Sequence, residues 1–248
     1  MSGTIPGGSM PTILLTRPAE GSARFAEELR ARLGEVPIVQ SPVLRIIGTG
    51  AQPDLSDDPV VLFTSRNGVT HCGVTPKRGQ RALCVGDATA QMARAAGFDA
   101  VSASGDVEDL LRLVTHEAPK RPLLHLRGEH SAGDLAARLR KAGLRVRETV
   151  VYDQVPVALT DAARATLNDD APVVVPLFSP RSAQAFANQG PWHAPLFIAA
   201  ISAAAAQAAP RPSFRLDVAA EPTLPAMLAA TCGLFNAAQL LERESPAQ

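Results

Sequence analysis

Cysteine and aromatic residues are scarce in this chain of 248 residues, which contains three cysteines, one tyrosine and one tryptophan. The odd number of cysteines and the absence of any Cys-x-x-Cys pair argue against a disulfide framework and against a zinc site. Cys72, Cys84 and Cys232 lie in apolar segments, as small core residues do. The chain must therefore rely on an ordinary hydrophobic core.

Net charge is also absent, because 24 Lys and Arg residues balance 24 Asp and Glu residues. A general binder of nucleic acid or of acidic membranes would be more basic. No apolar run reaches the length of a membrane span without an interrupting charge or proline, and no signal-peptide pattern opens the chain. We therefore expect no nucleic-acid or membrane partner, a cytoplasmic location, and local donors wherever an anionic ligand binds.

The common cofactor and nucleophile motifs are missing as well. The chain has no Gly-x-Gly-x-x-Gly, no Walker-type loop and no Gly-x-Ser-x-Gly, so dinucleotide, triphosphate and acyl-transfer functions lack support. The five histidines show no metal-ligand spacing, and a neutral surface or core histidine is the better interpretation of each. We expect neither a cofactor nor a metal.

The most informative segment is residues 60–69, where Val-Val-Leu-Phe is followed by Thr-Ser-Arg-Asn-Gly. An apolar run that ends in polar residues is typical of a buried parallel strand leading into a loop at the carboxyl edge of its sheet. Ligands bind at that edge in open α/β sheets. The segment therefore predicts a binding loop.

Two segments recur later in the chain at nearly the same spacing. The form of residues 62–67 returns at 177–182, an offset of 177 − 62 = 115 positions. Residues 85–91 return at 201–207, an offset of 201 − 85 = 116. The repetition suggests two similar lobes, and the alternative is a chance match between short strings.

Strands and helices alternate along the chain, which predicts parallel, doubly wound sheets. The middle part, residues 60–126, contains four predicted strands, whereas the C-terminal part contains only three. The N-terminal strand at 12–16 and its helix, for which Ser22 is the expected N-cap, would complete the C-terminal sheet. The alternating segment 145–155 is expected to pair with 42–47.

We therefore predict an α/β fold with two similar doubly wound parallel-sheet lobes joined by a two-stranded β-ladder hinge. The predicted boundaries are residues 10–40 plus 157–248 for the first lobe, 58–143 for the second lobe, 41–57 and 144–156 for the two-stranded linker, and 1–9 for a flexible leader.

Polar residues follow the predicted strands throughout. Hydroxyls and free amides at helix N-termini suit carboxylate or phosphate groups, and Arg can grip a carboxylate with two parallel hydrogen bonds. For any single Ser or Thr a helix cap or turn is the better interpretation, but the loops taken together, facing one cleft, favour binding. The candidate substrate-binding residues are Arg17, Thr64, Ser65, Arg66, Asn67, Gly86, Asp87, Ala88, Arg127, Gly128, Ser179, Arg181, Ser182 and Ser202.

Six short segments match one enzyme family in both order and spacing. They are residues 15–18 (Leu-Thr-Arg-Pro), 63–69 (Phe-Thr-Ser-Arg-Asn-Gly-Val), 85–90 (Val-Gly-Asp-Ala-Thr-Ala), 126–128 (Leu-Arg-Gly), 150–152 (Val-Val-Tyr) and 178–180 (Phe-Ser-Pro). On these segments the chain resembles the uroporphyrinogen-III synthase family over nearly its whole length after Met10. The resemblance implies two α/β lobes joined by a two-stranded ladder and a reaction without a cofactor.

The resemblance also implies the chemistry. Hydroxymethylbilane, a linear tetrapyrrole that bears many carboxylates, would lose water and close to uroporphyrinogen III with ring D inverted, through a spirocyclic pyrrolenine. The family's hinge tyrosine corresponds to Tyr152 and its first-cleft threonine to Thr89, which are the implied catalytic residues. Because the precursor is already reactive, positioning is expected to do most of the work. The implied partners are this substrate and a transient handover from hydroxymethylbilane synthase, and we expect a monomer.

One segment departs from the family pattern. Where such proteins often carry Gly-Pro-Thr-Thr-Ala, this chain has Ser-Ala-Ala-Ala-Ala at 202–206, which leaves Ser202 as the one hydroxyl. Backbone amides at that helix start could still bind a carboxylate. The Arg181 guanidinium could replace the missing threonine hydroxyls as a donor. The departure keeps a non-catalytic binding or regulatory protein on the same fold as an alternative. A third hypothesis, an unrelated two-lobed enzyme for a phosphorylated metabolite, would use the same helix N-termini.

Tyr152→Phe tests the only tyrosine in the chain, which lies at the predicted hinge. A phenol there can donate a proton or a hydrogen bond, and the alternative is an ordinary residue of an amphipathic strand. We expect the variant to lower kcat for hydroxymethylbilane more than it raises KM, measured by steady-state kinetics. An unchanged kcat would remove Tyr152 from the mechanism.

Overall fold

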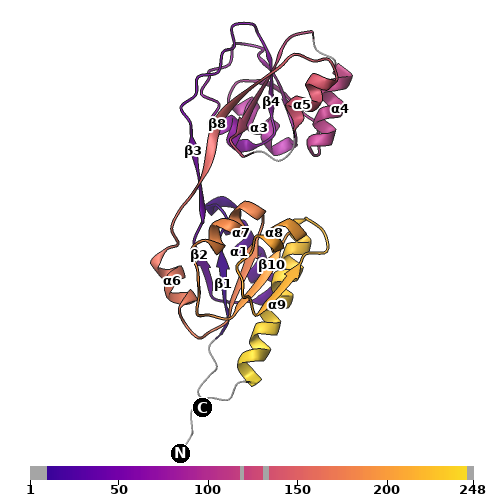
Figure 1. The fold of residues 1–248 in the computed structure, drawn as a ribbon. Coiled ribbons are helices and arrows are strands. Elements are labelled where there is room, and N and C mark those ends of the chain that lie inside the picture. The colour runs from indigo at the N-terminus through magenta and orange to yellow at the C-terminus, as the bar shows by residue number, and fades with distance from the viewer. Residues whose placement is uncertain (1–9, 118–119, 131–133, 245–248) are drawn as a thin grey trace, which may run out of the picture. The chain divides into compact units, whose positions relative to one another are not determined.

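The computed structural model describes residues 10–117, 120–130 and 134–244 (Figure 1). The chain forms two compact units, which we call the first lobe (Met1–Arg45 with Pro156–Gln248) and the second lobe (Ile46–Val155). Each lobe is a predominantly parallel sheet with helices on both faces, so the predicted α/β fold class is confirmed. The predicted leader, residues 1–9, lies outside the described residues.

The sheet of the first lobe combines both ends of the chain. All of its paired strands are parallel, and β1 lies between β9 and β2. The strand count predicted that the N-terminal strand joins this sheet. The N-terminal strand thus completes a sheet whose other half comes from the last third of the sequence. In spatial order the strands are β11 (Arg215–Val218), β10 (Leu196–Ala200), β9 (Val173–Leu177), β1 (Thr12–Leu15) and β2 (Ile38–Gln40).

Alternate residues of these strands pack against different helices. Val173 and Val175 belong to the core formed with α6 (Asp161–Leu167) and α7 (Pro180–Ala187). Val174, between them, belongs to the core on the other side, with α1 (Ala19–Leu33) and α9 (Leu224–Glu244). Every position of such a strand is buried, which explains why its sequence is a continuous apolar run. A short helix, α8 (Ala203–Gln207), follows β10.

Helix α9 is long and apolar enough, over Leu224–Leu241, to cross a membrane by length and composition. Its Met227, Leu228, Leu234 and Phe235 side chains are instead buried in the core beside the sheet of the first lobe. The helix contacts β9 and β10, and 33% of the Leu224–Leu241 window is buried inside the protein. The feature is therefore weak evidence for a membrane span.

The second lobe has a six-stranded sheet. Its β5–β4–β7–β8 core and the neighbouring β6 pair in parallel. Helices α2 (Arg66–Thr70) and α3 (Asp87–Ala95) cover one face, and α4 (Val107–Glu117) and α5 (Leu135–Lys141) cover the other. In spatial order the strands are β3 (Leu44–Gly48), β8 (Val146–Pro156), β7 (Leu123–Gly128), β4 (Val60–Phe63), β5 (Arg81–Cys84) and β6 (Asp99–Ser102).

Strands β3 and β8 carry the chain between the lobes. The Thr49 amide donates to the Val151 carbonyl and the Val157 amide donates to the Val43 carbonyl, both at 3.0 Å. The two pairs have the same sum, 49 + 151 = 43 + 157, so the strands run antiparallel. The predicted pairing of residues 42–47 with 145–155 is confirmed, and both strands also belong to the six-stranded sheet.

The two lobes share one strand order. The order β11-β10-β9-β1-β2 in the first lobe corresponds to β6-β5-β4-β7-β8 in the second, where β3 is added at the edge. The sequence repeat therefore reflects a structural one, although its register differs slightly. Ser65 and Ser179 are equivalent helix caps at an offset of 179 − 65 = 114, whereas the letters match best at 115.

The expected N-cap at Ser22 is wrong. Helix α1 begins at Ala19, directly after Pro18, and Ser22 lies inside its first turns. The Ser22 hydroxyl donates to the Arg17 carbonyl at 2.9 Å. Pro18 occupies the N-cap position with φ −52°, and no side-chain hydrogen bond caps the helix.

Candidate functional site

Strand order creates one topological switch point in each sheet. From β4 the chain proceeds outward to β5 and β6, and then returns to the other side of β4 as β7 and β8. The first lobe has the same reversal between β9 and β1. Loops at the carboxyl ends of strands on either side of such a point frame the usual ligand crevice of an open α/β sheet. Within each lobe, these loops contain most of the candidate residues.

In the second lobe, the loop after β4 begins helix α2. The Ser65 hydroxyl caps this helix by accepting the Asn67 amide at 3.0 Å. Arg66 is exposed on the first turn. A Cβ on Gly68 would lie 2.9 Å from the Leu126 carbonyl oxygen, so glycine permits the close approach of α2 to β7.

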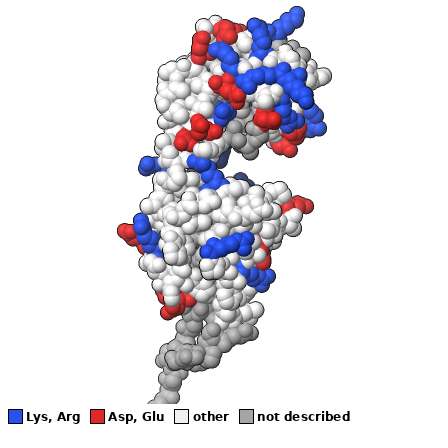
Figure 2. All heavy atoms as spheres, in the orientation of Figure 1, with Lys and Arg blue, Asp and Glu red and all other residues white. Residues whose placement is uncertain are grey.

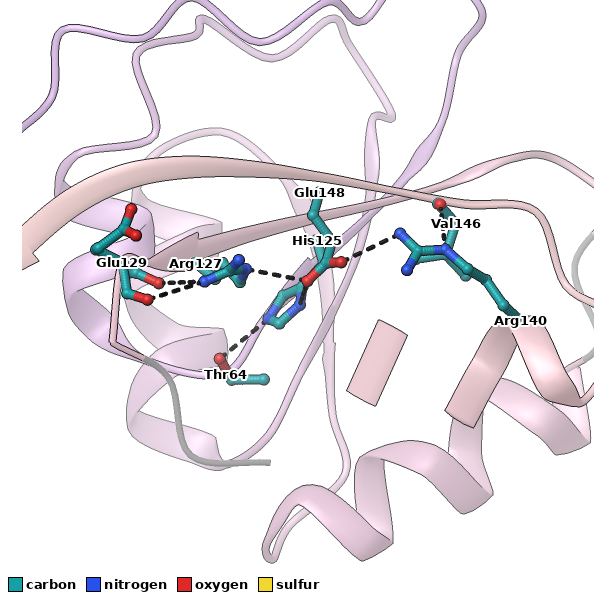
Figure 3. Close-up of polar contacts among 8 residues, drawn as sticks. Thr64, His125, Arg127, Glu129, Arg140, Val146 and Glu148 are labelled. Atoms are coloured by element: carbon teal, nitrogen blue, oxygen red, sulfur yellow. Dashed lines mark hydrogen bonds and ion pairs between the residues drawn. The ribbon is translucent and has the colours of Figure 1, made fainter. Parts of the chain in front are cut away.

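Arg127 and Gly128 end the neighbouring strand β7. The Arg127 Nη1 donates to the Gly128 carbonyl at 2.8 Å and to the Glu129 carbonyl at 3.1 Å, and its Nε lies 3.0 Å from the Glu148 carboxylate. The guanidinium therefore braces its own loop (Figure 3). The sequence suggested only an anion-binding role for Arg127 and did not indicate that its side chain stabilises this loop.

Tyr152 packs directly over Gly128. A Cβ on Gly128 would lie 2.6 Å from ring atoms of Tyr152 and 2.9 Å from its phenol oxygen. The tyrosine is 6% exposed, and its carbonyl accepts the Glu129 amide at 2.9 Å. An irregularity in the β7–β8 register places Gly128 opposite Tyr152. The phenol thus lies at the carboxyl end of β7, beside the switch point of the second lobe.

The start of helix α3 follows β5. Gly86 is the N-cap residue, and its carbonyl accepts the amides of Thr89 and Ala90 at 3.1 and 3.0 Å. Thr89 is 6% exposed, whereas Asp87 and Ala88 are exposed. The Asp87 carboxylate accepts the Ser104 hydroxyl at 3.2 Å. An anionic side chain here suits the helix dipole but repels a carboxylate ligand, so Asp87 is better matched to an N–H donor.

In the first lobe, Arg17 follows β1. Its guanidinium lies 3.9 Å above the centroid of the Phe178 ring, and a Cβ on Gly21 would be 3.2 Å from its Cζ. Partial burial lowers the pKa of Arg17 from its ordinary value, although an arginine at this position stays charged. The Phe178 ring also meets Phe25 edge-on at 5.0 Å. These contacts hold a cation at the switch point of the first lobe.

Serine caps complete the first-lobe loops. The Ser179 hydroxyl accepts the Ser182 amide at 3.0 Å, and the Ser182 hydroxyl donates to the Ser179 carbonyl at 3.0 Å. Ser202 caps α8 by accepting the Ala205 amide at 3.3 Å. Arg181 lies half-buried in the first turn of α7. The capping interpretation therefore holds for Ser65, Ser179 and Ser202. A serine oxygen that accepts a backbone amide can still donate its own proton to another group.

A buried polar cluster lies behind the second-lobe loops (Figure 3). His125 on β7 is 3% exposed, and its Nε2 lies 3.2 Å from the Thr64 hydroxyl. Its Nδ1 lies 3.8 Å from the Glu148 carboxylate, which also lies 3.0 Å from Arg127 and 3.1 Å from Arg140. Burial lowers the pKa of His125 to about 4, against the opposing effect of Glu148. The ring is therefore neutral at pH 7.

Sequence analysis anticipated a neutral histidine but missed this cluster. Its only trace in the sequence is the charged residue Arg127 two positions after His125, on the same face of a strand that is otherwise apolar. The partner Glu148 pairs with His125 only in the folded sheet. For residues 10–117, 120–130 and 134–244, no group of three or more His, Cys, Asp and Glu side chains is placed to hold a metal ion.

Charged side chains of both signs gather on the second lobe in the view of Figure 2, where acidic and basic groups alternate. Many are paired, as in Arg138 with Glu108, Arg147 with Asp57 and Arg121 with Asp58. A mixed surface of this kind produces no strong field of one sign. Anion recognition must then come from individual loops.

Two α/β lobes with polar loops at the carboxyl ends of parallel strands define a class of enzymes that bind a small molecule through helix N-termini. A family model, described as uroporphyrinogen-III synthase HemD, matches residues 12–229. The chain belongs to the uroporphyrinogen-III synthase family, whose members are lyases of tetrapyrrole synthesis. The earlier resemblance is thereby confirmed.

Solved structures of this family align with nearly the whole chain. The Helicobacter pylori 26695 uroporphyrinogen-III synthetase shares the fold, with a TM-score of 0.64 at 18% identity over 91% of this chain and 100% of that one. A mutant uroporphyrinogen III synthase from the bacterium Thermus thermophilus aligns with a TM-score of 0.48 at 16% identity, over 92% and 99% of the two chains. A search of curated protein sequences returns no significant match.

Gly128→Ala should displace the Tyr152 ring, because the new methyl group would lie 2.6 Å from ring atoms. A shift of about an ångström in a catalytic group can cost on the order of a hundredfold in rate, so we expect kcat to fall by roughly ten- to a hundredfold. Gly233→Ala is the matched control, since nothing lies within 4 Å of its Cβ. It should leave kcat unchanged and stabilise helix α9 by about 0.5–1 kcal/mol. Equal kcat values for Gly128→Ala and wild type would contradict the assigned role of the ring.

The buried His125 should make stability depend on pH. Its pKa falls from the ordinary 6.5 to about 4 on folding, so the unfolded chain takes up a proton first as the pH drops. The folded state is then destabilised progressively between about pH 6.5 and pH 4, by at most about 3 kcal/mol. Urea unfolding across this range should show a shallower pH dependence for His125→Gln than for wild type. Parallel curves would show that the histidine titrates alike in both states.

Proposed function

We propose that this enzyme binds hydroxymethylbilane through the loops at the carboxyl ends of its two sheets and closes it to uroporphyrinogen III with ring D inverted. The observation that carries the proposal is the presence, at both switch points, of polar loops in a chain of the uroporphyrinogen-III synthase family. No finding favours the non-catalytic alternative.

Carboxylates of the substrate are assigned to the donors of these loops. Backbone amides in the first turn of α8 point out of the helix start, where the dipole favours an anion. The Ser65 and Ser202 hydroxyls retain a proton after capping their helices. Arg17, held by Phe178, supplies a preorganised cation in the first lobe.

Tyr152 is assigned as the acid that assists loss of water. As the bond from the terminal methylene carbon to its hydroxyl breaks, the phenol proton passes to the departing oxygen and the pyrrole electrons stabilise the cation that remains. Attack by ring D at its substituted carbon then forms the spirocyclic pyrrolenine. The bond from that carbon to the methylene that leads to ring C breaks, the free α-carbon of ring D attacks this methylene, and the proton lost from that α-carbon as the pyrrole is restored returns to the phenolate. Packing of Tyr152 on Gly128 fixes the position of the phenol, and Thr89 at the start of α3 positions the substrate.

Positioning is assigned the larger share of catalysis. The linear substrate closes without help to a different isomer, so the enzyme must select one ring-closing geometry rather than create a new reactivity. Many weak donors on rigid helix starts can hold a flexible polycarboxylate in one conformation. The alanines after Ser202 fit this view, because α8 still offers backbone amides where other members often have hydroxyls.

The reactive substrate also bears on the setting of the enzyme. Because free hydroxymethylbilane closes by itself, transient handover from hydroxymethylbilane synthase would protect the yield of the correct isomer. We propose that the protein acts as a monomer in the cytoplasm, in keeping with its mixed surface charge.

A coupled assay tests the proposed function. Hydroxymethylbilane is generated in place, and the oxidised products are separated by chromatography into type I and type III isomers. We expect a shift from type I to type III on addition of the protein, and we expect Arg17→Ala to raise KM because a carboxylate partner is lost. Formation of type I alone by properly folded protein would overturn the proposal.

A further inference from the structure

Thr64 differs from the serines at the other helix starts. Ser65, Ser179 and Ser202 each accept a backbone amide of their own helix. Ser65 and Ser202 keep a proton to donate to a ligand, whereas the Ser179 hydroxyl lies 2.9 Å from the Ser182 hydroxyl. The Thr64 hydroxyl instead faces His125 Nε2 at 3.2 Å. Thr64 is half-buried and stands at the end of β4, at the switch point of the second lobe. Its hydrogen-bonding direction therefore depends on which nitrogen of His125 carries the proton.

The surroundings of the ring select one tautomer. A proton on Nε2 would leave the lone pair of Nδ1 facing the Glu148 carboxylate at 3.8 Å, which is repulsive in a buried site. A proton on Nδ1 turns this contact into an attraction, although 3.8 Å is too long for a hydrogen bond and Nδ1 has no hydrogen-bond partner among the described residues. The Glu148 carboxylate also lies 3.0 Å from Arg127 and 3.1 Å from Arg140. The Nδ1–H tautomer is therefore favoured.

The preferred tautomer determines the role of the hydroxyl. With the proton on Nδ1, Nε2 is an acceptor, and the Thr64 hydroxyl must donate its single proton to it. The two lone pairs of the Thr64 oxygen are then the groups that remain for a ligand. Thr64 would present an acceptor at an edge where the capping serines present donors.

We propose that Glu148 and His125 are positioning residues that hold the Thr64 hydroxyl as a hydrogen-bond acceptor for a pyrrole N–H of the substrate. This inference rests on the proposed function and deepens it. A linear tetrapyrrole carries carboxylates, which need donors, and pyrrole N–H groups, which need acceptors. Thr64 serves the second class, whereas the sequence pattern suggested that it would serve the first. A substrate conformer that places a carboxylate at Thr64, or an N–H group at a serine that donates, would pair two acceptors or two donors. Such a conformer would bind less tightly than the correct one.

The tautomer can be measured without any assay of activity. In a protein labelled with ¹⁵N-histidine, the ring nitrogens of His125 are assigned by the signals that disappear in His125→Gln. We expect a protonated Nδ1 and an unprotonated Nε2 at neutral pH. The opposite pattern would overturn the inference whether or not the protein forms the type III isomer.

A double-mutant cycle tests the link to the substrate. Thr64→Val removes the hydroxyl at nearly constant shape and should raise KM for hydroxymethylbilane by roughly fivefold, the size of one hydrogen bond. His125→Leu should raise KM by a similar factor alone, but by less than about twofold when Val already replaces Thr64. Full, independent effects in both backgrounds would show that His125 acts only through packing.

Two further variants keep the test decisive. His125→Gln retains an oxygen that can accept the Thr64 proton, so its KM should lie closer to wild type than that of His125→Leu. Thr115→Val on α4 is the matched control, because Thr115 is exposed and its hydroxyl bonds only the Leu111 carbonyl among the described residues. It should leave KM unchanged. Equal KM values for the Gln and Leu variants would contradict the acceptor role.

Discussion

Parallel pairing of β1 with β9 is the constraint on which the first lobe depends. The register places Thr12 opposite Val173 and Ile13 opposite Val174. Residues about 160 positions apart in the sequence must therefore pair to form two inner strands of the sheet. Both strands are buried on both faces, and neither could remain exposed without a large loss of apolar burial. The insertion of the second lobe between them follows from this closure, as does the position of Arg17 beside Phe178.

The same strand order appears twice, and it produces similar edges with different chemistry. Each switch point has a serine-capped helix start on one side and, on the other, a strand with an arginine at or just after its carboxyl end. In the first lobe the arginine rests on an aromatic ring, whereas Arg127 in the second lobe is engaged by backbone carbonyls and by Glu148. A duplicated scaffold therefore supports two distinct surfaces. Such divergence suits a substrate whose four rings present both carboxylates and N–H groups.

Polar residues at these edges have a structural role as well as the binding role that we propose. Ser65, Ser179 and Ser202 were recognised as ligand candidates from sequence, and each proves to be a helix cap. For Ser65 and Ser202 the two roles are compatible, because the oxygen accepts from the helix and the proton remains for a ligand. Selection for a stable helix start and selection for anion binding thus favour the same residue type. Sequence patterns alone cannot separate them.

The sequence by itself determined the α/β class, the alternation of elements, the discontinuous first lobe and the segments that carry polar loops. These features depend on local signals, such as the apolar run at 60–63 and the C-terminal part having three predicted strands where the middle part has four. Only the tertiary structure decided the packing of Tyr152 on Gly128 and the cluster of Glu148, His125 and Thr64. These contacts join different strands across the sheet, and their register depends on long-range pairing that no local pattern encodes.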